Sequence, residues 1–163
     1  MAAYNSSLVG ATKINGSLMN NLMSAFPAAP SAWVRRFAPL MAPGGTVLDV
    51  ACGGGRHSRL LAAAGHVVEA VALDAEALAV RRADLEDGPW PYAGRRFDGI
   101  VVCNYLHRPL FPLLADALAD GGVLIYETFM LGNERFGRPS NPDFLLRPNE
   151  LYEAFGSQLQ VVA

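Results

Sequence analysis

The chain has 163 residues, of which 52% are hydrophobic and 17% charged, and its formal net charge at pH 7 is −2. This length fits one domain with a sheet covered by helices on both faces, and the composition excludes a disordered or nucleic-acid-coating protein. Neither a signal peptide nor an apolar stretch long enough to span a bilayer is present, so we expect a cytoplasmic protein that binds no membrane and no nucleic acid.

Residues 1–30 are polar and rich in Ala, Ser and Asn, and we expect an extension that packs loosely. The domain is then expected over residues 31–163. Ser31 can cap a helix, which the run 43–45, Pro-Gly-Gly, ends before the first strand. One face of this helix is expected to carry the large apolar residues Trp33, Phe37 and Leu40.

The run TVLDVACGGGR, residues 46–56, predicts a strand, a turn with little side chain and the start of a helix. Glycine tolerates positive φ and carries no Cβ, so main-chain N–H groups of this turn can face a bound molecule. The helix is expected from about Gly55 to Ala64, where Gly65 ends it. Its sheet-facing side is expected to hold Leu60, Leu61 and Ala64.

Asp49 indicates which ligand this turn suits. A dinucleotide-binding turn has the spacing G-x-G-x-x-G, with a helix N-terminus that meets a pyrophosphate. Here Gly53 and Gly55 fit that spacing, but Ser58 takes the third place. The carboxylate of Asp49 favours a ligand with an ammonium or sulfonium group over one with phosphates. S-adenosylmethionine has both cations and no phosphate.

Apolar strands alternate with helical stretches along the chain, which is typical of an α/β fold with a doubly wound, mostly parallel sheet. Leucines from Leu110 to Leu118 recur at helical spacing with Asp116 and Asp120 turned outward, and Pro148 is expected to begin a helix that runs to Gly156. The expected strands are Thr46–Val50, Val67–Leu73, Gly99–Cys103 and Val123–Phe129, with a further strand that begins over Leu159–Ala163.

Three later segments continue the pattern that the glycine turn begins, namely ADLED at Ala83–Asp87, FDGIVVCNYLHR at Phe97–Arg108 and GGVLIYETF at Gly121–Phe129. In order and kind they resemble the motifs of class I S-adenosylmethionine-dependent methyltransferases. The first motif of that family is a hydrophobic strand, an acid, and three glycines at alternate positions. Its places are taken here by Asp49, Ala51, Gly53 and Gly55, with Ala51 in place of the first glycine.

The segment YETF and the following GNERFGRPSNPDFLLRPNEL are similar, more narrowly, to small bacterial methyltransferases related to the tellurite-resistance group. The resemblance covers Ser31 to Ala163. It implies a Rossmann-like sheet with the strand order 3-2-1-4-5-7-6, in which the last strand is absent here. It also implies S-adenosylmethionine as cofactor, S-adenosylhomocysteine as product, and a small-molecule acceptor held in line with the methyl group.

The resemblance assigns cofactor contacts residue by residue. It assigns the methionine part of the cofactor to Asp49 with Ala51, Cys52, Gly53 and Gly55. It assigns the ribose to Asp74 and the adenine to Asp84 with Leu85. The residues that it places beside the sulfonium are Asn104, Tyr105 and Leu106. No catalytic residue follows from it, and the acceptor-side candidates are His107, Arg108 and Glu127. Residues 130–147 look like a lid over the acceptor, in which Arg135, Arg138 and Arg147 are nearly balanced by Glu134 and Asp143.

The chain departs from the family pattern in two places. Counting from Gly65 puts Ala72 at the position of the ribose-binding acid, with Asp74 two residues later on the same strand face. Only nine residues separate Asp74 from Asp84, whereas a crossover helix and a strand need about a dozen or more, so we expect residues to be missing between about His66 and Val80. The family's closing antiparallel hairpin has only its first strand here, so we expect an incomplete C-terminus.

Each candidate also has a structural interpretation. Asp49 can cap the helix or order the turn, Asp84 can end a strand in a turn, and Asp74 can begin a helix. His107 and Arg108 can anchor a loop, and Glu127 can bind the loop around Arg138.

His57 suits a structural or solvent-facing position and Cys103 a core position. Cys52 and Cys103 lack metal-ligand spacing, so we expect neither a metal site nor a disulfide. Two other functions stay open beside the methyltransferase. One is a nicotinamide-dependent oxidoreductase, and the other is a non-catalytic binding protein that kept the fold.

Overall fold

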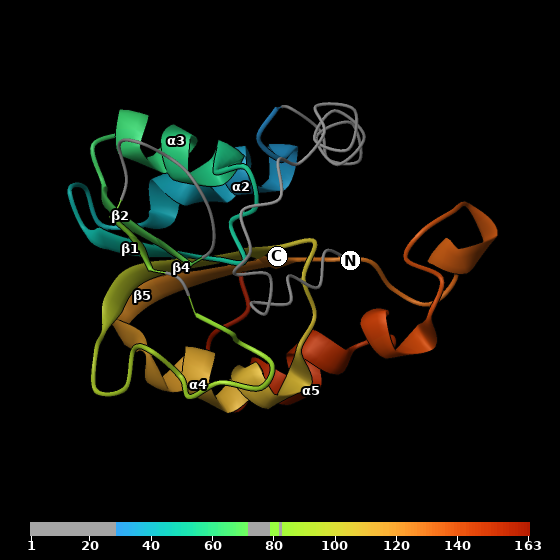
Figure 1. Ribbon diagram of the computed structural model, residues 1–163. Helices are drawn as coiled ribbons and strands as arrows, with labels where there is room; N and C mark the ends of the chain where they lie inside the picture. Colours follow the sequence, from blue (N-terminus) through green and yellow to red (C-terminus); the bar gives the residue numbers. More distant parts are fainter. Residues whose placement is uncertain (1–28, 72–78, 82) are drawn as a thin grey trace, which may run out of the picture.

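The computed structural model describes residues 29–71, 79–81 and 83–163. Its sheet has five parallel strands in the order β3-β2-β1-β4-β5, as the sequence predicts for the first five strands. Figure 1 shows the sheet as a central layer, with α2 and α3 on one face and α4 and α5 on the other. The doubly wound α/β fold is therefore confirmed. The predicted loose extension, residues 1–30, falls almost wholly outside the described residues.

The helices have six to eight residues and are shorter than the average helix of about 11–12 residues, whereas the strands are of ordinary length. The strands are β1 Thr46–Val50, β2 Val67–Val71, β3 Ala79–Arg81, β4 Phe97–Cys103 and β5 Leu118–Glu127. The helices are α2 Ala32–Phe37, α3 Arg56–Ala63, α4 Phe111–Asp116 and α5 Glu150–Phe155. Short 3₁₀ turns are η1 Ala38–Leu40, η2 Arg108–Leu110, η3 Asn133–Arg135 and η4 Pro142–Phe144. None of the helices in the described part of the chain is long and apolar enough to cross a lipid bilayer.

β3 is a strand that the sequence reasoning did not place. It pairs in parallel with β2, with Ala70 opposite Val80. The connection between the two strands is residues 72–78, shorter than the dozen or so residues that a parallel crossover usually takes. Ala72, Asp74 and the end of the predicted second strand lie in that connection, outside the described residues, and so does the predicted gap in the sequence.

α2 begins at the predicted cap, where the Ser31 hydroxyl oxygen accepts a hydrogen bond from the backbone N–H of Trp33 at 3.0 Å. The predicted buried face is wrong, because Trp33 and Leu40 are 37% and 53% exposed. The buried side is the neighbouring stripe Val34, Ala38 and Met41. A smaller stripe fits here because the helix lies close to the sheet, and the Met41 side chain fills the place that a Cβ on Gly99 would take.

α3 has the predicted position, and Gly65 with φ +92° turns the chain away after it. Leu61 is fully buried and Leu60 packs partly buried beside it, as predicted. Ala64 is exposed rather than sheet-facing, because the helix ends one residue before it.

Three predictions for the second half of the chain need correction. α5 begins at Glu150 rather than Pro148, because Asn149 adopts φ +64° and interrupts the helix before it. The segment Leu159–Ala163 is not a strand, since it pairs with no strand of the described sheet and ends in exposed residues. α4 lies within the predicted helical stretch but ends at Asp116, because Leu118 and Asp120 belong to β5, which begins before the predicted Val123. Asp116 and Asp120 are both exposed, as predicted.

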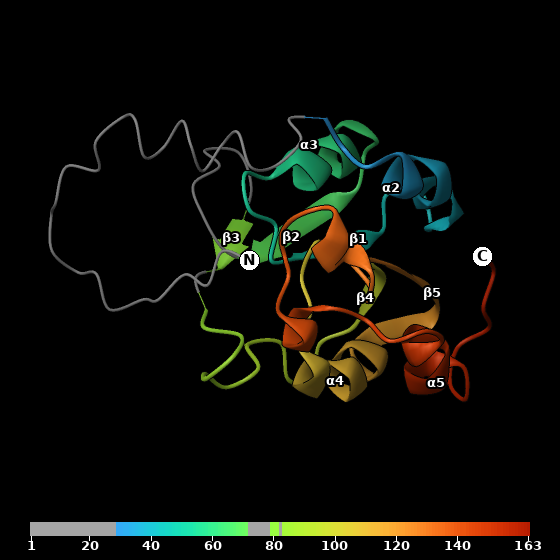
Figure 2. The same ribbon diagram turned by 90° about the vertical axis from the view of Figure 1, so that its right-hand side faces the viewer.

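The core has two parts, one on each face of the sheet. Under α2 and α3 it contains Val47, Leu61 and Val101, and on the side of α4 and α5 it contains Leu48, Ile100 and Phe155. Figure 2 looks at the edge where the strands end and shows the segment 130–147 in front of β1 and β4. The fold therefore leaves this carboxyl edge as the place where loops from several strands meet.

Candidate functional site

β1, β4 and β5 end side by side at the carboxyl edge of the sheet. Val50 pairs with Val102, and Cys103 pairs with Glu127, so the three strands finish nearly level. Open α/β sheets bind their ligands at this edge. The segments that the sequence analysis singled out after β1, β4 and β5 therefore lie together in the structure.

The glycine turn after β1 is open on its outer side. Ala51, Gly53 and Gly55 have φ of +54°, +54° and +70°. The Gly55 N–H donates to the Cys52 carbonyl oxygen at 3.0 Å, and the Cys52 N–H donates to the Val71 carbonyl oxygen at 3.2 Å, which joins the turn to β2.

A Cβ added to Gly53 or Gly54 would meet nothing within 4 Å, so packing does not explain the missing side chains there. Within the described ranges, the N–H groups of Gly53 and Gly54 also have no protein acceptor. The turn therefore offers space and hydrogen-bond donors to a ligand, in the form that the sequence analysis predicts.

Asp49 lies behind this turn, with 1% of its surface exposed. The Ser58 hydroxyl donates a hydrogen bond to its carboxylate. Burial raises the pKa of Asp49 to about 6, although the hydrogen bonds from Ser58 and the charge of Arg56 act to lower it. The structure thus shows Asp49 bound to the first half of α3 across the turn, and direct contact with a ligand stays a prediction. The role of Ser58 was missed, although its place in the glycine spacing marked it.

Five side chains from four elements form a polar group at this edge, which we call the edge cluster: Ser31, Arg56, His57, Cys103 and Glu127. The Ser31 N–H donates to His57 Nε2 at 3.1 Å, and the Ser31 hydroxyl donates to a carboxylate oxygen of Glu127. Arg56 Nε donates to the same His57 nitrogen at 3.2 Å, and Arg56 Nη2 contacts Cys103 Sγ at 3.5 Å. Glu127 therefore binds Ser31 in this structure, rather than the Arg138 loop.

His57 and Cys103 have the structural positions that the sequence analysis allowed them. His57 is 3% exposed, and burial together with the charge of Arg56 lowers its pKa to about 4. Nε2 of His57 accepts both of these hydrogen bonds, so it carries no proton and the imidazole is neutral. Burial raises the pKa of the Cys103 thiol, which is therefore protonated at neutral pH.

The loop after β4 is held by β5. The Asn104 N–H donates to the Glu127 carbonyl oxygen at 2.8 Å, with Asn104 at φ +58°. The Tyr126 hydroxyl donates to the Tyr105 carbonyl oxygen at 3.0 Å, and Leu106 is buried in the core on the side of α4 and α5. This loop, predicted to flank a sulfonium, thus has a fixed backbone next to Glu127.

Asp84 forms a tight turn, as its structural interpretation requires. One carboxylate oxygen accepts the N–H groups of Glu86 and Asp87 at 3.0 and 3.1 Å. These hydrogen bonds hold the pKa of Asp84 below its ordinary value, with a smaller contribution from nearby His107. Leu85 packs partly buried on the core. A contact of Asp84 or Leu85 with adenine stays a prediction.

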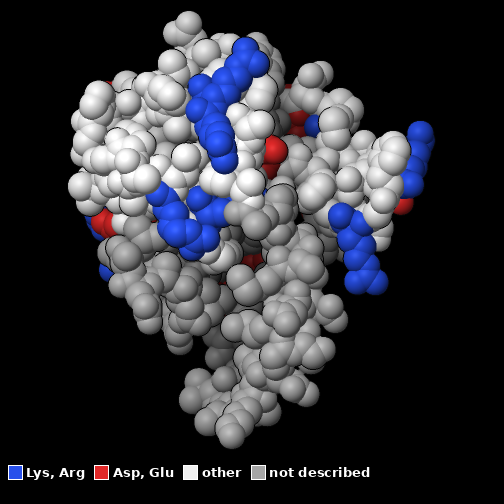
Figure 3. Space-filling view, turned by 90° about the horizontal axis from the view of Figure 1, so that it is seen from above, with Lys and Arg blue, Asp and Glu red and all other residues white. Residues whose placement is uncertain are grey.

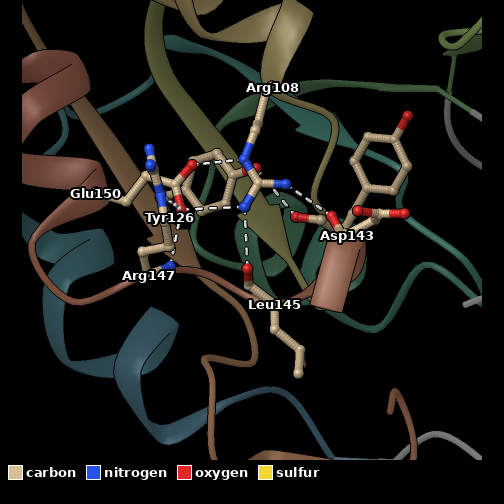
Figure 4. Close-up of polar contacts among 7 residues, drawn as sticks. Arg108, Tyr126, Asp143, Leu145, Arg147 and Glu150 are labelled. Carbon is tan, nitrogen blue, oxygen red and sulfur yellow. Dashed lines mark hydrogen bonds and ion pairs between the residues drawn. The ribbon is translucent and has the colours of Figure 1, made fainter. Parts of the chain in front are cut away.

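Arg108 is a loop anchor (Figure 4). Its Nε donates to Glu150 Oε1 at 2.5 Å, and its Nη2 donates to Glu150 Oε2 at 3.1 Å. The guanidinium also donates to the carbonyl oxygens of Asp143 and Leu145, at 2.7 and 3.0 Å. The hydrogen bonds from Arg108 to the Glu150 carboxylate hold the pKa of Glu150 down at about 2. The structure thus uses Arg108 to fix the segment before α5, and all three guanidinium nitrogens donate hydrogen bonds there.

The segment 130–147 projects beyond the sheet and lines an open pocket of about 450 Å³ with its first residues. Met130 bridges to Leu146 at the base of the segment, and Phe136 is 90% exposed. Arg147 Nε lies 3.6 Å from Glu150 Oε2, beside the Arg108 anchor. A lid function stays a prediction. No group of three or more possible metal ligands occurs among the residues that the structure describes.

The comparison with protein families finds one match. The profile of a family described as "Methyltransferase domain" matches residues 24–141. No curated protein matches the chain significantly.

Several solved structures share the fold. The sugar N-methyltransferase KedS8 from a Streptoalloteichus species is 27% identical with a TM-score of 0.51, over 81% of this chain and 61% of that one. A TehB-like SAM-dependent methyltransferase from Corynebacterium glutamicum is 21% identical with a TM-score of 0.58, over 87% of this chain and 79% of that one. DesVI from Streptomyces venezuelae is 19% identical with a TM-score of 0.53, over 75% of this chain and 61% of that one. The chain thus spans less than two thirds of KedS8 and DesVI.

Proposed function

Because this chain belongs to the methyltransferase domain family, we propose that it transfers a methyl group from S-adenosylmethionine to a small molecule. The observation that carries the proposal is the open glycine turn after β1. Its N–H groups and the empty space beside Gly53 and Gly54 fit a ligand that comes close to the main chain. S-adenosylmethionine, when bound, supplies a methyl group that its sulfonium already activates for transfer.

On this proposal the turn holds the amino-acid end of the cofactor. The N–H groups of Gly53 and Gly54 face its carboxylate, and the buried charge of Asp49 behind the turn favours its ammonium group. Ala51, Cys52 and Gly55 shape the turn around it. Asp84 and Leu85 bind the adenine, and the backbone after β4, Asn104 to Leu106, lies along the sulfonium.

The protein's contribution is then to align the acceptor and exclude water, since the methyl donor needs little further activation. Arg108 serves this purpose indirectly, because it fixes the segment 130–147 at the mouth of the site. His107 and Glu127 remain on the acceptor side. KedS8 is a sugar N-methyltransferase, which supports an amine among the candidate acceptors.

We also place the protein in the cytoplasm. Cys52 and Cys103, both among the described residues, are buried and form no disulfide, which suits a reducing compartment. The acidic net charge of −2 supports a small molecule, rather than a nucleic acid, as the acceptor.

The test is a calorimetric titration of the full chain with S-adenosylhomocysteine. We expect saturable binding by the wild type and a loss of at least tenfold in affinity for Gly54→Val. A Cβ at Gly54 would meet no atom of the described residues within 4 Å, so we expect the variant to fold normally and to obstruct only the ligand. Ala62→Val, on the exposed side of α3, is the matched control and should bind as the wild type does.

A flat titration of the wild type would overturn the proposal. Tight binding of NADH without binding of S-adenosylhomocysteine would favour the nicotinamide-dependent oxidoreductase instead. Equal affinities of Gly54→Val and the wild type for S-adenosylhomocysteine would show that the ligand does not bind at the glycine turn.

A further inference from the structure

Glu127 presents a carboxylate beside the loop that follows β4. It is the last residue of β5, opposite Cys103, and its carbonyl oxygen accepts the N–H of Asn104 at 2.8 Å. Neighbouring strands are about 4.8 Å apart, so Glu127 lies about 10 Å along the edge from the end of β1, two strands away. The glycine turn and Glu127 thus lie at the two ends of one short stretch of the carboxyl edge.

The orientation expected for the proposed cofactor places the acceptor at this stretch of the carboxyl edge. Its adenosine would extend from the turn towards β2 and β3, where Asp84 begins the next loop. Its methyl group would then face the opposite way, towards the ends of β4 and β5. Because the acceptor has to attack in line with the leaving sulfur, it approaches from the side of Glu127.

The Glu127 carboxylate is held in place without being buried. Ser31 donates its hydroxyl to one carboxylate oxygen, and the Ser31 N–H is bound in turn to His57. Glu127 is only partly buried, so a ligand can reach it. The charged group that shares the cluster with it is Arg56, which contacts Cys103 at 3.5 Å, while His57 is neutral.

The surface around this edge carries charges of both signs. Seen from above (Figure 3), arginines spread over the helices and the projecting segment, and acidic side chains appear in the hollow between them. The arginine that could have drawn an anion into the site from the β4 loop, Arg108, is bound to Glu150 and two carbonyl oxygens. Arg108 is therefore not free to offset the charge of Glu127 for an anionic acceptor.

We propose, on the basis of the methyl transfer proposed above, that Glu127 selects acceptors that carry an amine. An amine gains a charge-assisted hydrogen bond from the carboxylate, a neutral hydroxyl gains less, and an anionic group is repelled. Before the transfer, the bound ammonium gives up one proton, which passes through Glu127 to water and frees the nitrogen lone pair. The amine nitrogen then forms a bond to the methyl carbon as the carbon–sulfur bond breaks, the electron pair of that bond stays on sulfur, and the methylated nitrogen keeps the positive charge.

The test measures binding, with the full chain saturated by S-adenosylhomocysteine. Two series of probes are titrated and followed by NMR: benzylamine, benzyl alcohol and benzoate, and glucosamine, glucose and glucuronate. Within each series the ring is kept and the functional group changes. We expect the amine to bind at least fivefold more tightly than its two counterparts in at least one series. We expect Glu127→Gln to lose that preference and to bind S-adenosylhomocysteine as before.

Two variants separate recognition from structure. Ser31→Ala removes the hydrogen bond to Glu127 and keeps the carboxylate, so it should retain the preference for the amine. Glu153→Gln changes an exposed carboxylate on α5 and should match the wild type. The inference is overturned if no series shows an amine preference, if Glu127→Gln retains it, or if Ser31→Ala loses as much as Glu127→Gln. Failure of the wild type to bind S-adenosylhomocysteine would instead overturn the proposed function itself.

Discussion

Ala51 has a backbone conformation that suits glycine better than alanine. Its φ of +54° lies in the left-handed region, where a Cβ crowds the carbonyl oxygen that follows. This penalty is about 1–2 kcal/mol, whereas the extra flexibility of glycine in the unfolded chain costs about 0.5–1 kcal/mol. We therefore expect Ala51→Gly to raise the free energy of unfolding by about 0.5–1 kcal/mol, measured by urea denaturation.

Ala62→Gly is the control for this variant. Ala62 is exposed within α3, where glycine costs about 1 kcal/mol relative to alanine. The two alanine-to-glycine changes should thus shift the unfolding midpoint in opposite directions. If both lower it, Ala51 does not have its left-handed conformation in solution.

Asp49 makes stability depend on pH, because burial raises the pKa of its carboxyl from 3.8 to about 6 in the folded chain. An acid with a higher pKa in the folded state contributes stability that is complete below pH 4 and is lost as the pH rises through 6. A shift of about 2 pKa units corresponds to about 3 kcal/mol. The free energy of unfolding of Asp49→Asn, minus that of the wild type, should therefore grow by about 2–3 kcal/mol between pH 4 and pH 7.

This difference is measured by urea denaturation of both proteins at each pH. His57 titrates in the opposite sense, since its lowered pKa removes stability as the pH falls from 6.5 to 4. Because His57 is present in both proteins, its contribution cancels in the difference. A difference that stays constant with pH would show that Asp49 is not buried behind the turn.

At the scale of elements, the short helix α5 and the segment before it depend on Arg108. The guanidinium joins η2 to η4 and α5, and Glu150, its partner, is 5% exposed. Arg108→Ala removes the nearer of two cations from this buried carboxylate and leaves only the exposed Arg147, 3.6 Å away, so we expect a loss of up to about 3 kcal/mol of stability. We expect trypsin to cleave after Arg135 at least tenfold faster in this variant, because the segment 130–147 loses its anchor.

Arg36→Ala, an exposed arginine on α2, is the control and should leave both the cleavage rate and the unfolding midpoint unchanged. The double variant Arg108→Ala, Glu150→Ala should lose less stability than the two single variants together, since it leaves no unpaired charge. Wild-type cleavage kinetics in Arg108→Ala would mean that the segment is held in another way.

Elements with a strong local signal could be predicted closely, and those set by packing could not. β1 was predicted at its exact bounds, because a β-branched run ends there at a glycine turn. The buried face of α2 was missed, since Gly99 in a distant strand decides that Met41 fits and Trp33 does not. The start of α5 was missed because Asn149 adopts a left-handed conformation that the pair Pro148-Asn149 does not reveal.

For the molecule as a whole, the alternation of strands and helices predicted the parallel, doubly wound sheet. The glycine turn and three later motifs carried the resemblance to methyltransferases, and that resemblance implied the order of the five strands. The two parts of the candidate site differ in how far the sequence predicts them. The glycine turn is a local feature and could be read from residues 51–55. The edge cluster could not, because its hydrogen bonds join residues as far apart as Ser31 and Glu127, which no local pattern connects.

That long connection has a consequence for how the molecule acquires its activity. Ser31 and Glu127 are 96 positions apart, so their hydrogen bond can form only after β5 has been synthesised and has taken its place in the sheet. A nascent chain on the ribosome contains the glycine turn well before that moment. On the function proposed above, the carboxylate that selects the acceptor belongs to β5, so the ability to select an acceptor arises late in folding and is lost whenever β5 detaches.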